Sequence, residues 1–216
     1  MWTYSYIRPY LQTGDIILFH CNTYSSPLNQ LGYYIRDKIG GIDYSHAGIV
    51  YRPSDDELYI LEVVNHDQPS NDKSLFFNGQ TSGLRIALLD DVMYDYSIEC
   101  HGNYAVKFIQ QPIDNVCIEQ HIPKYSTQTF SSYTRIGEIA ITDIIMGHAK
   151  AIALSKEHPD KMFCTQFVYD MLRDCGVMNE NAGFDGTVFF LQHFNDDKFS
   201  KFTKVEYSKI EPFSYP

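Results

Sequence analysis

Short apolar runs separated by turn residues mark the first part of the chain. Residues 16–19 read Ile-Ile-Leu-Phe, and such a continuous run is consistent with a buried strand. Two longer runs, residues 43–51 and 58–64, are separated by the turn-forming segment 52–56. We expect these two runs to form an antiparallel hairpin. We also expect Asp15 to hold the turn before the first run through its side chain.

The same pattern predicts further strands in the middle of the chain and near its end. Residues 84–89 are mostly apolar and strand-like. Residues 96–100 and 104–109 form another candidate pair, with the turn 101–103 between them. A last strand is expected near residues 204–207.

Apolar residues recur at helical spacing in three longer segments, 25–39, 137–157 and 160–176. The third helix is expected to begin with Asp160 as its N-cap and to stop at Gly176. The second contains the most apolar stretch of the chain. That stretch is too short to span a bilayer, because a spanning helix needs about 20 apolar residues. We therefore expect a soluble, largely buried helix there.

Length and composition favour one globular domain. A chain of 216 residues suits a single domain over residues 1–216, in which the proline-containing segment 111–135 is expected to be an irregular insertion. The 17 tyrosines and 14 phenylalanines argue against disorder. A formal net charge of −10, without any block of basic residues, argues against a nucleic-acid partner.

The five cysteines show neither the spacing of a zinc site nor that of a disulfide framework. Their number is odd, no C-x-x-C occurs, and they are scattered as Cys21, Cys100, Cys117, Cys164 and Cys175. Reduced thiols in a cytosol-like compartment are therefore expected. The first residues lack the layout of a signal peptide, so we expect a cytoplasmic protein. No cofactor or metal is expected, since no H-E-x-x-H or similar spacing is present.

His46 and Glu62 are the first candidates for chemistry. His46 lies near the start of a predicted strand among small residues, which leave one imidazole face open to act as a base. Glu62 shares a strand face with apolar residues, and such a local conflict is expected at functional sites. Two alternatives stay open. In the first, His46 is a half-buried structural residue without a chemical role. In the second, Glu62 belongs to an edge strand whose two faces are both partly exposed to water.

Cys164 is the third candidate, in the first turn of its predicted helix. The partial positive charge and the free amides of that turn lower the pKa of a thiol. The same amides are suited to hold the oxyanion of an acyl-transfer intermediate. Cys175 lies late in the helix, where the dipole opposes a thiolate, so it is rejected as the nucleophile. The alternative is that Cys164 is a buried and inert core residue.

Together the three residues form a nucleophile, a base and an orienting carboxylate. Positions 46 and 62 are symmetric about residue 54, which lies in the predicted turn. We therefore expect His46 and Glu62 to face each other across the hairpin. Cross-strand partners have Cβ atoms about 5 Å apart, which is close enough for Glu62 to fix the imidazole tautomer.

Four short motifs follow one another along the chain. They are Gly14-Asp15-Ile16, Ser45-His46-Ala47-Gly48-Ile49-Val50, Leu61-Glu62-Val63 and Phe163-Cys164-Thr165-Gln166-Phe167-Val168. In order and spacing they resemble the permuted papain-like, NlpC-type cysteine amidases. The chain is most similar to the YiiX-like branch, which is related to lecithin:retinol acyltransferase-like proteins and places the histidine strand before the cysteine helix. The resemblance covers residues 11–64 and 158–176 and leaves the middle unmatched.

The resemblance implies an α+β fold, a circularly permuted papain-like domain in which a small antiparallel sheet packs against helices. It implies a triad of Cys164, His46 and Glu62. The expected protein is a cysteine hydrolase or acyltransferase that acts on an amide or ester bond through a thioester. Its substrate would be a small amide or ester, a peptide or a lipid acyl group, and peripheral membrane contact is compatible with this. No C-terminal hydrophobic anchor, which some acyltransferase-like members carry, is seen in the sequence.

Two other functions remain open at this point. One is an inactive member of the same fold that binds a lipid or a peptide in the cleft. The other is a metal-dependent hydrolase that uses His46, Glu62 and other histidines, which the missing ligand spacing makes the weaker of the two.

Overall fold

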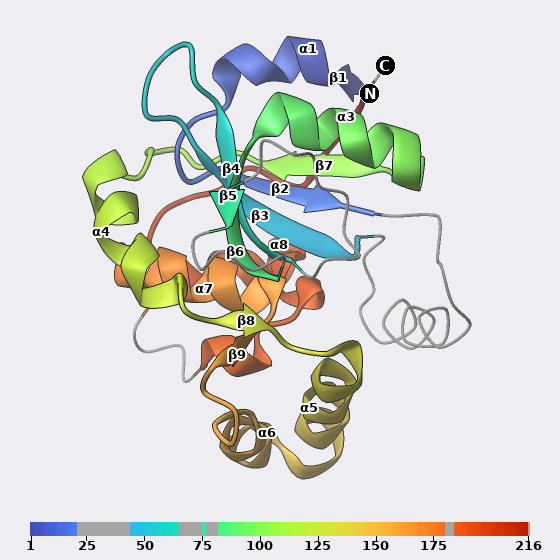
Figure 1. Cartoon of the computed structure of the whole chain (residues 1–216), viewed down its shortest axis with the longest axis vertical. Coiled ribbons are helices and arrows are strands. Elements are labelled where there is room, and N and C mark those ends of the chain that lie inside the picture. Colours follow the sequence, from blue (N-terminus) through green and yellow to red (C-terminus); the bar gives the residue numbers. More distant parts are fainter. Residues whose placement is uncertain (21–43, 65–74, 77–81, 180–183, 216) are drawn as a thin grey trace.

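An eight-stranded sheet covered by helices on both faces forms the centre of the protein (Figure 1). The computed structural model describes residues 1–20, 44–64, 75–76, 82–179 and 184–215. Neighbouring strands of the sheet are antiparallel, except for the parallel pair at one edge. The fold is therefore α+β with a mixed sheet, and this sheet is larger than the small antiparallel one expected.

The strand order across the sheet is β1-β10-β7-β2-β3-β4-β6-β5. The strands span Trp2–Thr3 (β1), Ile16–Phe19 (β2), His46–Tyr51 (β3), Tyr59–Val64 (β4), Leu75–Phe76 (β5), Gly83–Leu88 (β6), Tyr104–Lys107 (β7) and Glu211–Ser214 (β10). A second sheet is the parallel pair of Thr129–Phe130 (β8) and Lys161–Met162 (β9).

Helices occupy both sides of the main sheet and extend below it. They span Tyr4–Ile7 (α1), Leu89–Cys100 (α3), Asn115–Tyr125 (α4), Tyr133–Met146 (α5), His148–Ser155 (α6), Cys164–Asp174 (α7) and Asp196–Phe202 (α8). Three short 3₁₀ helices span Arg8–Tyr10 (η1), Gly186–Val188 (η3) and Leu191–Phe194 (η4). Within the described ranges, no helix combines the length and apolar character that crossing a membrane requires.

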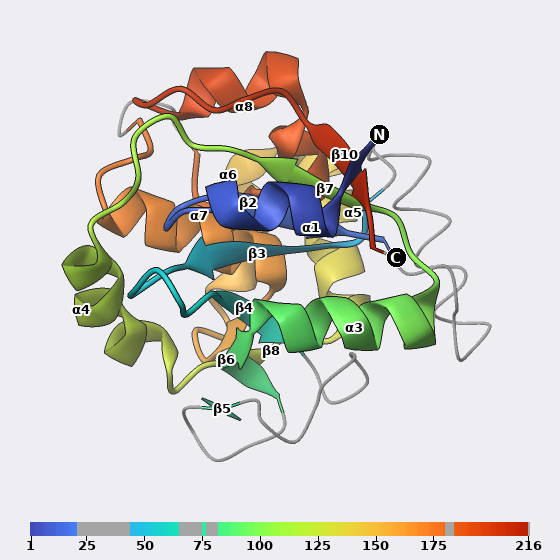
Figure 2. The same ribbon diagram turned by 90° about the horizontal axis from the view of Figure 1, so that it is seen from above.

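The central strands are buried on both faces because two layers of helices cover them. In β2, Ile16 and Leu18 belong to the core that includes α7, whereas Ile17 and Phe19 belong to the core that includes α1 and α3. The two views agree: α1 and α3 lie on one side of β2 and β3, and α7 lies on the other (Figures 1 and 2). Two-sided burial explains why these strands read as continuous apolar runs rather than alternating ones.

The turn before β2 is held by Asp15, as predicted. The Asp15 carboxylate accepts hydrogen bonds from the backbone N–H groups of Gln12 and Ile109, each 2.8 Å long. The turn also places Gly14 at φ 102°, a backbone conformation that favours glycine. Asp15 thereby connects the start of β2 to the segment that follows β7.

The predicted strands at 16–19, 43–51, 58–64 and 84–89 are confirmed as β2, β3, β4 and β6. The predicted helix over residues 25–39 lies outside the described residues. The strand expected near residues 204–207 is wrong, because the last strand is β10. In that region only an isolated bridge joins Tyr207 to Ile109.

The predicted strand at residues 96–100 is also wrong, because these residues end helix α3. The buried positions of α3 follow helical spacing and pack against the sheet; they are Leu89, Val92, Met93, Tyr96 and Cys100. The helix begins directly after β6, without an intervening turn residue. That direct junction hides the boundary from a sequence-based interpretation.

Residues 111–135 are not irregular, because they contain α4. The helix begins after Asp114, whose side chain accepts a hydrogen bond from the N–H of Val116 at 3.0 Å. Pro123 lies inside the last turn of α4. This proline makes the segment look unsuited to a helix, but tertiary packing against α7 overrides the local preference.

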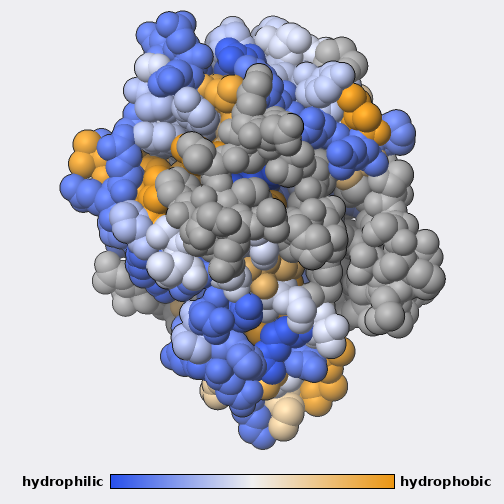
Figure 3. Space-filling model, in the orientation of Figure 1, coloured by the Kyte–Doolittle hydropathy of each residue, from blue (hydrophilic) through white to orange (hydrophobic). Residues whose placement is uncertain are grey.

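The helix expected over residues 137–157 is two helices that form the projecting hairpin α5–α6 (Figure 1). The break falls at Gly147, whose φ of 85° and ψ of 164° interrupt the helical backbone. The expectation of extensive burial is wrong for α5. Hydrophobic surface gathers at the tip of this hairpin (Figure 3), where the exposed fractions of Ile144 and Ile145 are 59% and 75%.

Three disulfide-bonded cysteines contradict the expectation of reduced thiols. Cys117 of α4 is bonded to Cys175, which caps the C-terminus of α7, and Cys100 is disulfide-bonded as well. Among the described cysteines, Cys164 alone carries a free thiol. The scattered spacing of the cysteines in the sequence did not indicate this pairing. With these cysteines oxidised, cysteine usage no longer supports a cytosol-like compartment.

Candidate active site

His46 is the first residue of β3, at the end of the sheet. Its imidazole is buried, with an exposed fraction of 5% for the residue. The ring lies next to Phe19, with centroids 5.7 Å apart, and is almost parallel to the ring of Tyr96 at 6.4 Å. These aromatic neighbours, from β2 and α3, hold the imidazole plane in one orientation.

Glu62 of β4 is fully buried and accepts a hydrogen bond from His46. The contact joins Nε2 of His46 to Oε2 of Glu62. The predicted contact therefore exists, but the predicted register is wrong. Ile49 pairs with Leu61 and Tyr51 with Tyr59, so the hairpin is shifted by two residues from the expected pairing.

In this register Gly48, rather than His46, lies opposite Glu62. Glu62 reaches His46 diagonally along the same face of the sheet, which is within range for long side chains. A Cβ atom at Gly48 would lie 2.6 Å from Cδ1 of Ile60 and 3.2 Å from the carbonyl oxygen of Leu61. Glycine therefore permits the close approach of the two strands beside this contact.

Arg85 is a fourth member of the site that sequence analysis did not identify. It lies directly opposite Glu62 on β6 and is fully buried. Its Nε donates to Oε1 of Glu62 at 2.8 Å, and its Nη2 lies 2.7 Å from the same oxygen. Each carboxylate oxygen of Glu62 therefore has its own partner. An arginine inside the apolar run of a predicted strand was the signal that could have been followed.

Cys164 begins α7, which packs against β3 and β4. The predicted N-cap, Asp160, is wrong, because residues 161–162 form β9 and Phe163 occupies the N-cap position. The thiol is free and buried, and it is hydrogen-bonded to the His46 side chain. The backbone N–H groups of Ala47 and Thr165 also donate to this sulfur.

The structure thus brings all three predicted side chains together. His46 can reach both layers because it starts its strand at the end of the sheet. Its ring contacts Tyr96 of α3 on one side, and it bonds to the thiol that begins α7 on the other. With Nε2 committed to Glu62, the other ring nitrogen, Nδ1, is the one left for Cys164.

The charges in this cluster favour a thiolate–imidazolium pair. Burial alone raises the pKa of the Cys164 thiol, but His46 and the two backbone N–H groups lower it overall. Burial alone lowers the pKa of His46, but Cys164 and Glu62 raise it overall. Burial alone raises the pKa of Glu62, but Arg85 and His46 lower it overall. A buried carboxylate, fixed by a buried guanidinium, thus holds the imidazole in its protonated form.

The first turn of α7 also presents backbone N–H groups that no helical hydrogen bond uses, and the N–H of Thr165 among them donates to the Cys164 sulfur. The first backbone hydrogen bond of this helix runs from the N–H of Phe167 to the carbonyl oxygen of Phe163 at 3.0 Å. The N–H groups of Cys164, Thr165 and Gln166 precede it and have no partner within the helix. Because they belong to the turn that Cys164 begins, these groups are suited to bind the oxyanion that forms on attack at a carbonyl carbon.

Comparison with known proteins finds a relative that aligns along nearly all of the chain, and the description of this relative states no activity. No family model matches the chain. The chain is 28% identical to "Uncharacterized protein R372" of Acanthamoeba polyphaga mimivirus over 217 residues, covering 98% of this chain and 85% of that protein. The similarity therefore extends along nearly all of this chain rather than over one motif.

Proposed function

We propose that the protein is a cysteine hydrolase or acyltransferase that acts on an amide or ester bond. The supporting observation is the buried series Cys164, His46, Glu62 and Arg85, in which each side chain contacts the next. We also propose that the domain is a circularly permuted, NlpC-type relative of papain. The order of the histidine strand and the cysteine helix, and the packing of that helix on the sheet, support this assignment.

In the proposed reaction, the Cys164 thiolate attacks the carbonyl carbon of the substrate. Negative charge passes to the carbonyl oxygen, and the N–H groups at the start of α7 bind it. His46 then gives its proton to the departing amine or alcohol, and a thioester remains on Cys164. Water or a second acceptor attacks the thioester while His46 accepts its proton, the sulfur leaves as a thiolate, and the thiolate–imidazolium pair is restored as the acyl group departs.

Glu62 has a positioning role in this scheme. Its hydrogen bond to Nε2 of His46 fixes the imidazole orientation and directs Nδ1 to the thiol. The substrate class is a small amide or ester, a peptide or a lipid acyl group.

Cysteine labelling tests the proposal directly. Purified protein is treated with iodoacetamide over a pH series, and modification of each cysteine is followed by mass spectrometry. We expect Cys164 to react well below pH 8, and His46→Ala to move the midpoint of that reaction to higher pH. His158→Ala removes an exposed imidazole that is not part of the site and should change nothing.

A panel of acyl esters and amides then tests turnover. Wild-type protein should form an acyl adduct on Cys164, and Cys164→Ala should form none while its circular dichroism spectrum is unchanged. A Cys164 that stays inert until the protein unfolds would contradict the proposal. The protein would then be a binding module of the same fold.

A further inference from the structure

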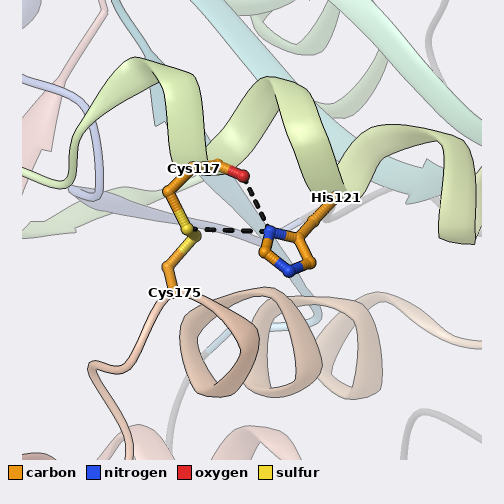
Figure 4. A group of neighbouring side chains, drawn as sticks. All are labelled: Cys117, His121 and Cys175. Atoms are coloured by element: carbon orange, nitrogen blue, oxygen red, sulfur yellow. Dashed lines mark hydrogen bonds between the residues drawn. A yellow bond between two sulfur atoms is a disulfide. The ribbon is translucent and has the colours of Figure 1, made fainter.

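A group of side chains that could bind a metal ion lies between α4 and α7. Cys117, His121 and Cys175 each direct one donor atom to a common point, and these atoms all lie within 4.8 Å of one another (Figure 4). All three residues are partly exposed. This group is separate from the candidate active site, because Cys175 caps the C-terminus of the helix that Cys164 begins. The two ends are roughly 16 Å apart along the helix axis.

The fold places these donors together without relying on the sulfur–sulfur bond. Cys117 and His121 are four residues apart on α4, so they lie on one face of that helix. Next to Cys175, Asp174 accepts hydrogen bonds from Lys124 and from the Tyr125 hydroxyl at the other end of α4. These polar contacts keep α4 against the end of α7 when the two thiols are reduced.

The separation between the Cys117 sulfur and the His121 nitrogen matches two ligands of a tetrahedral metal site, and the two sulfur atoms would have to separate on reduction to act as ligands. The distance from Sγ of Cys117 to Nδ1 of His121 is 3.6 Å. Two ligands of one tetrahedral Zn²⁺, with Zn–S of about 2.3 Å and Zn–N of about 2.05 Å, are also separated by about 3.6 Å. Nδ1 of His121 currently donates to the carbonyl oxygen of Cys117 at 2.8 Å. A bound ion would replace that proton, since a ligating imidazole nitrogen must be deprotonated.

We propose that Cys117, His121 and Cys175 form a Zn²⁺ site in the reduced protein, with water as the fourth ligand. Binding releases the protons of the two thiols and the proton on Nδ1, which passes to the other ring nitrogen or to solvent. The disulfide is the oxidised state of the same site. One protein thiolate attacks a small-molecule disulfide such as oxidised glutathione, forming a mixed disulfide and releasing one glutathione thiolate. The second protein thiolate attacks the protein sulfur of that mixed disulfide and releases the second glutathione thiolate, and both glutathione thiolates take up protons from water. This second attack forms the Cys117–Cys175 bond, and the ion leaves.

The test uses the full chain in two oxidation states. Reduced protein, freed of reductant under anaerobic conditions, is titrated with Zn²⁺ against a chromophoric chelator, and the bound metal is counted by mass spectrometry. We expect one tightly bound Zn²⁺ per reduced chain, and none once intact mass shows that the disulfide has formed. Co²⁺ in place of Zn²⁺ should give thiolate-to-cobalt charge-transfer absorption in the reduced protein only.

Single substitutions then separate the three ligands from other thiols. Cys117→Ser and Cys175→Ser should each abolish tight binding, and His121→Ala should weaken it by about tenfold or more. Cys164→Ser and Cys100→Ser serve as controls and should keep one Zn²⁺ per chain, because Cys164 is a free thiol in either state and Cys100 becomes one on reduction, yet neither belongs to the proposed site. Circular dichroism of each variant shows whether it is folded.

Two results would overturn the inference. One is a reduced, folded wild-type protein that takes up no Zn²⁺ at micromolar free metal. The other is a His121→Ala variant that binds as tightly as wild type, because the imidazole would then not be a ligand. Neither result bears on the proposed hydrolase or acyltransferase, whose test follows acylation of Cys164.

Discussion

At the scale of single residues, Glu62 links the other charged side chains of the site. It is a buried carboxylate with one oxygen bonded to His46 and the other to Arg85. Removing one partner of a buried ion pair leaves the other charge without compensation, which is strongly unfavourable. Arg85 therefore acts on the proposed nucleophile through two intermediate side chains, as a positioning residue rather than a catalytic one.

Replacing Arg85 by methionine should affect both stability and thiol chemistry. We expect the free energy of unfolding to fall by about 3–5 kcal/mol, because the buried charge of Glu62 loses its partner. In the protein that remains folded, the pKa of Glu62 should rise, the pKa of His46 should fall, and labelling of Cys164 should move to higher pH. Urea unfolding and iodoacetamide labelling measure the two effects.

Arg8→Met provides the matched control for that substitution. Arg8 pairs with Asp90 near the surface, where both side chains are partly exposed, and such pairs contribute about 0–1 kcal/mol. This variant should leave Cys164 labelling unchanged. Arg85→Lys keeps the charge and should recover part of the labelling at low pH. An unaltered labelling profile in Arg85→Met would show that Arg85 is merely structural.

The lowered pKa of Glu62 also predicts how stability depends on pH. Because the folded-state pKa lies below the unfolded value, the stabilisation is complete above the unfolded pKa and is lost as pH falls towards the folded pKa, about 2. The free energy of unfolding of wild type, minus that of Glu62→Gln, should therefore shrink as pH falls below about 4.5. Urea titrations at several pH values measure this difference, and a constant difference would refute the shift.

Three of the four site residues were predictable because each breaks a local rule. Glu62 is an acid among apolar neighbours, His46 begins a buried strand, and Cys164 lies in the first turn of a helix. Arg85 was not predictable in the same way. Its pairing with Glu62 depends on the register between β4 and β6, which tertiary packing sets. The two-residue error in the hairpin register has the same origin, because a shift of two preserves the face of every side chain.

At the scale of secondary-structure elements, backbone geometry limits what hydrophobic spacing can predict. The apolar pattern continues through residues 137–157, yet Gly147 separates α5 from α6 with a backbone conformation that is essentially restricted to glycine. The same limit explains the start of α7. Pairing of β9 with β8 takes residues 161–162 out of the helix, and a local pattern contains no information about that pairing.

Two glycine substitutions in the hairpin isolate the effect of backbone conformation. A Cβ atom would meet no other atom within 4 Å at either Gly137 or Gly147, so packing is not the difference between them. Gly147→Ala should destabilise the protein by about 1–3 kcal/mol, because alanine is strained at φ 85°. Gly137→Ala lies within α5 and should stabilise it by about 0.5–1 kcal/mol. Thermal unfolding of both variants tests this, and equal effects would contradict the explanation.

At the scale of the whole molecule, the Cys117–Cys175 disulfide joins two helices across a sequence separation of 58 residues. The chain between them contains most of α4, then β8, the α5–α6 hairpin, β9 and all of α7. This pairing could not be predicted from cysteine spacing, because sequence distance does not determine spatial distance. Cys164 lies within the same segment and stays free, so the protein combines an oxidised pair with a reduced candidate nucleophile.

The disulfide should stabilise the fold without being needed for Cys164 chemistry. Loop-closure entropy for a segment of this length corresponds to about 4 kcal/mol, so Cys117→Ala/Cys175→Ala should lower the free energy of unfolding by up to that amount. Both proteins are unfolded in urea with a chelator present, which excludes any contribution from bound metal. The double variant should still label at Cys164 with the wild-type pH profile, because α7 keeps its contacts with β3 and β4. If labelling of Cys164 at low pH disappears in the folded double variant, then the disulfide at the C-terminus of α7 also positions the N-terminus of that helix.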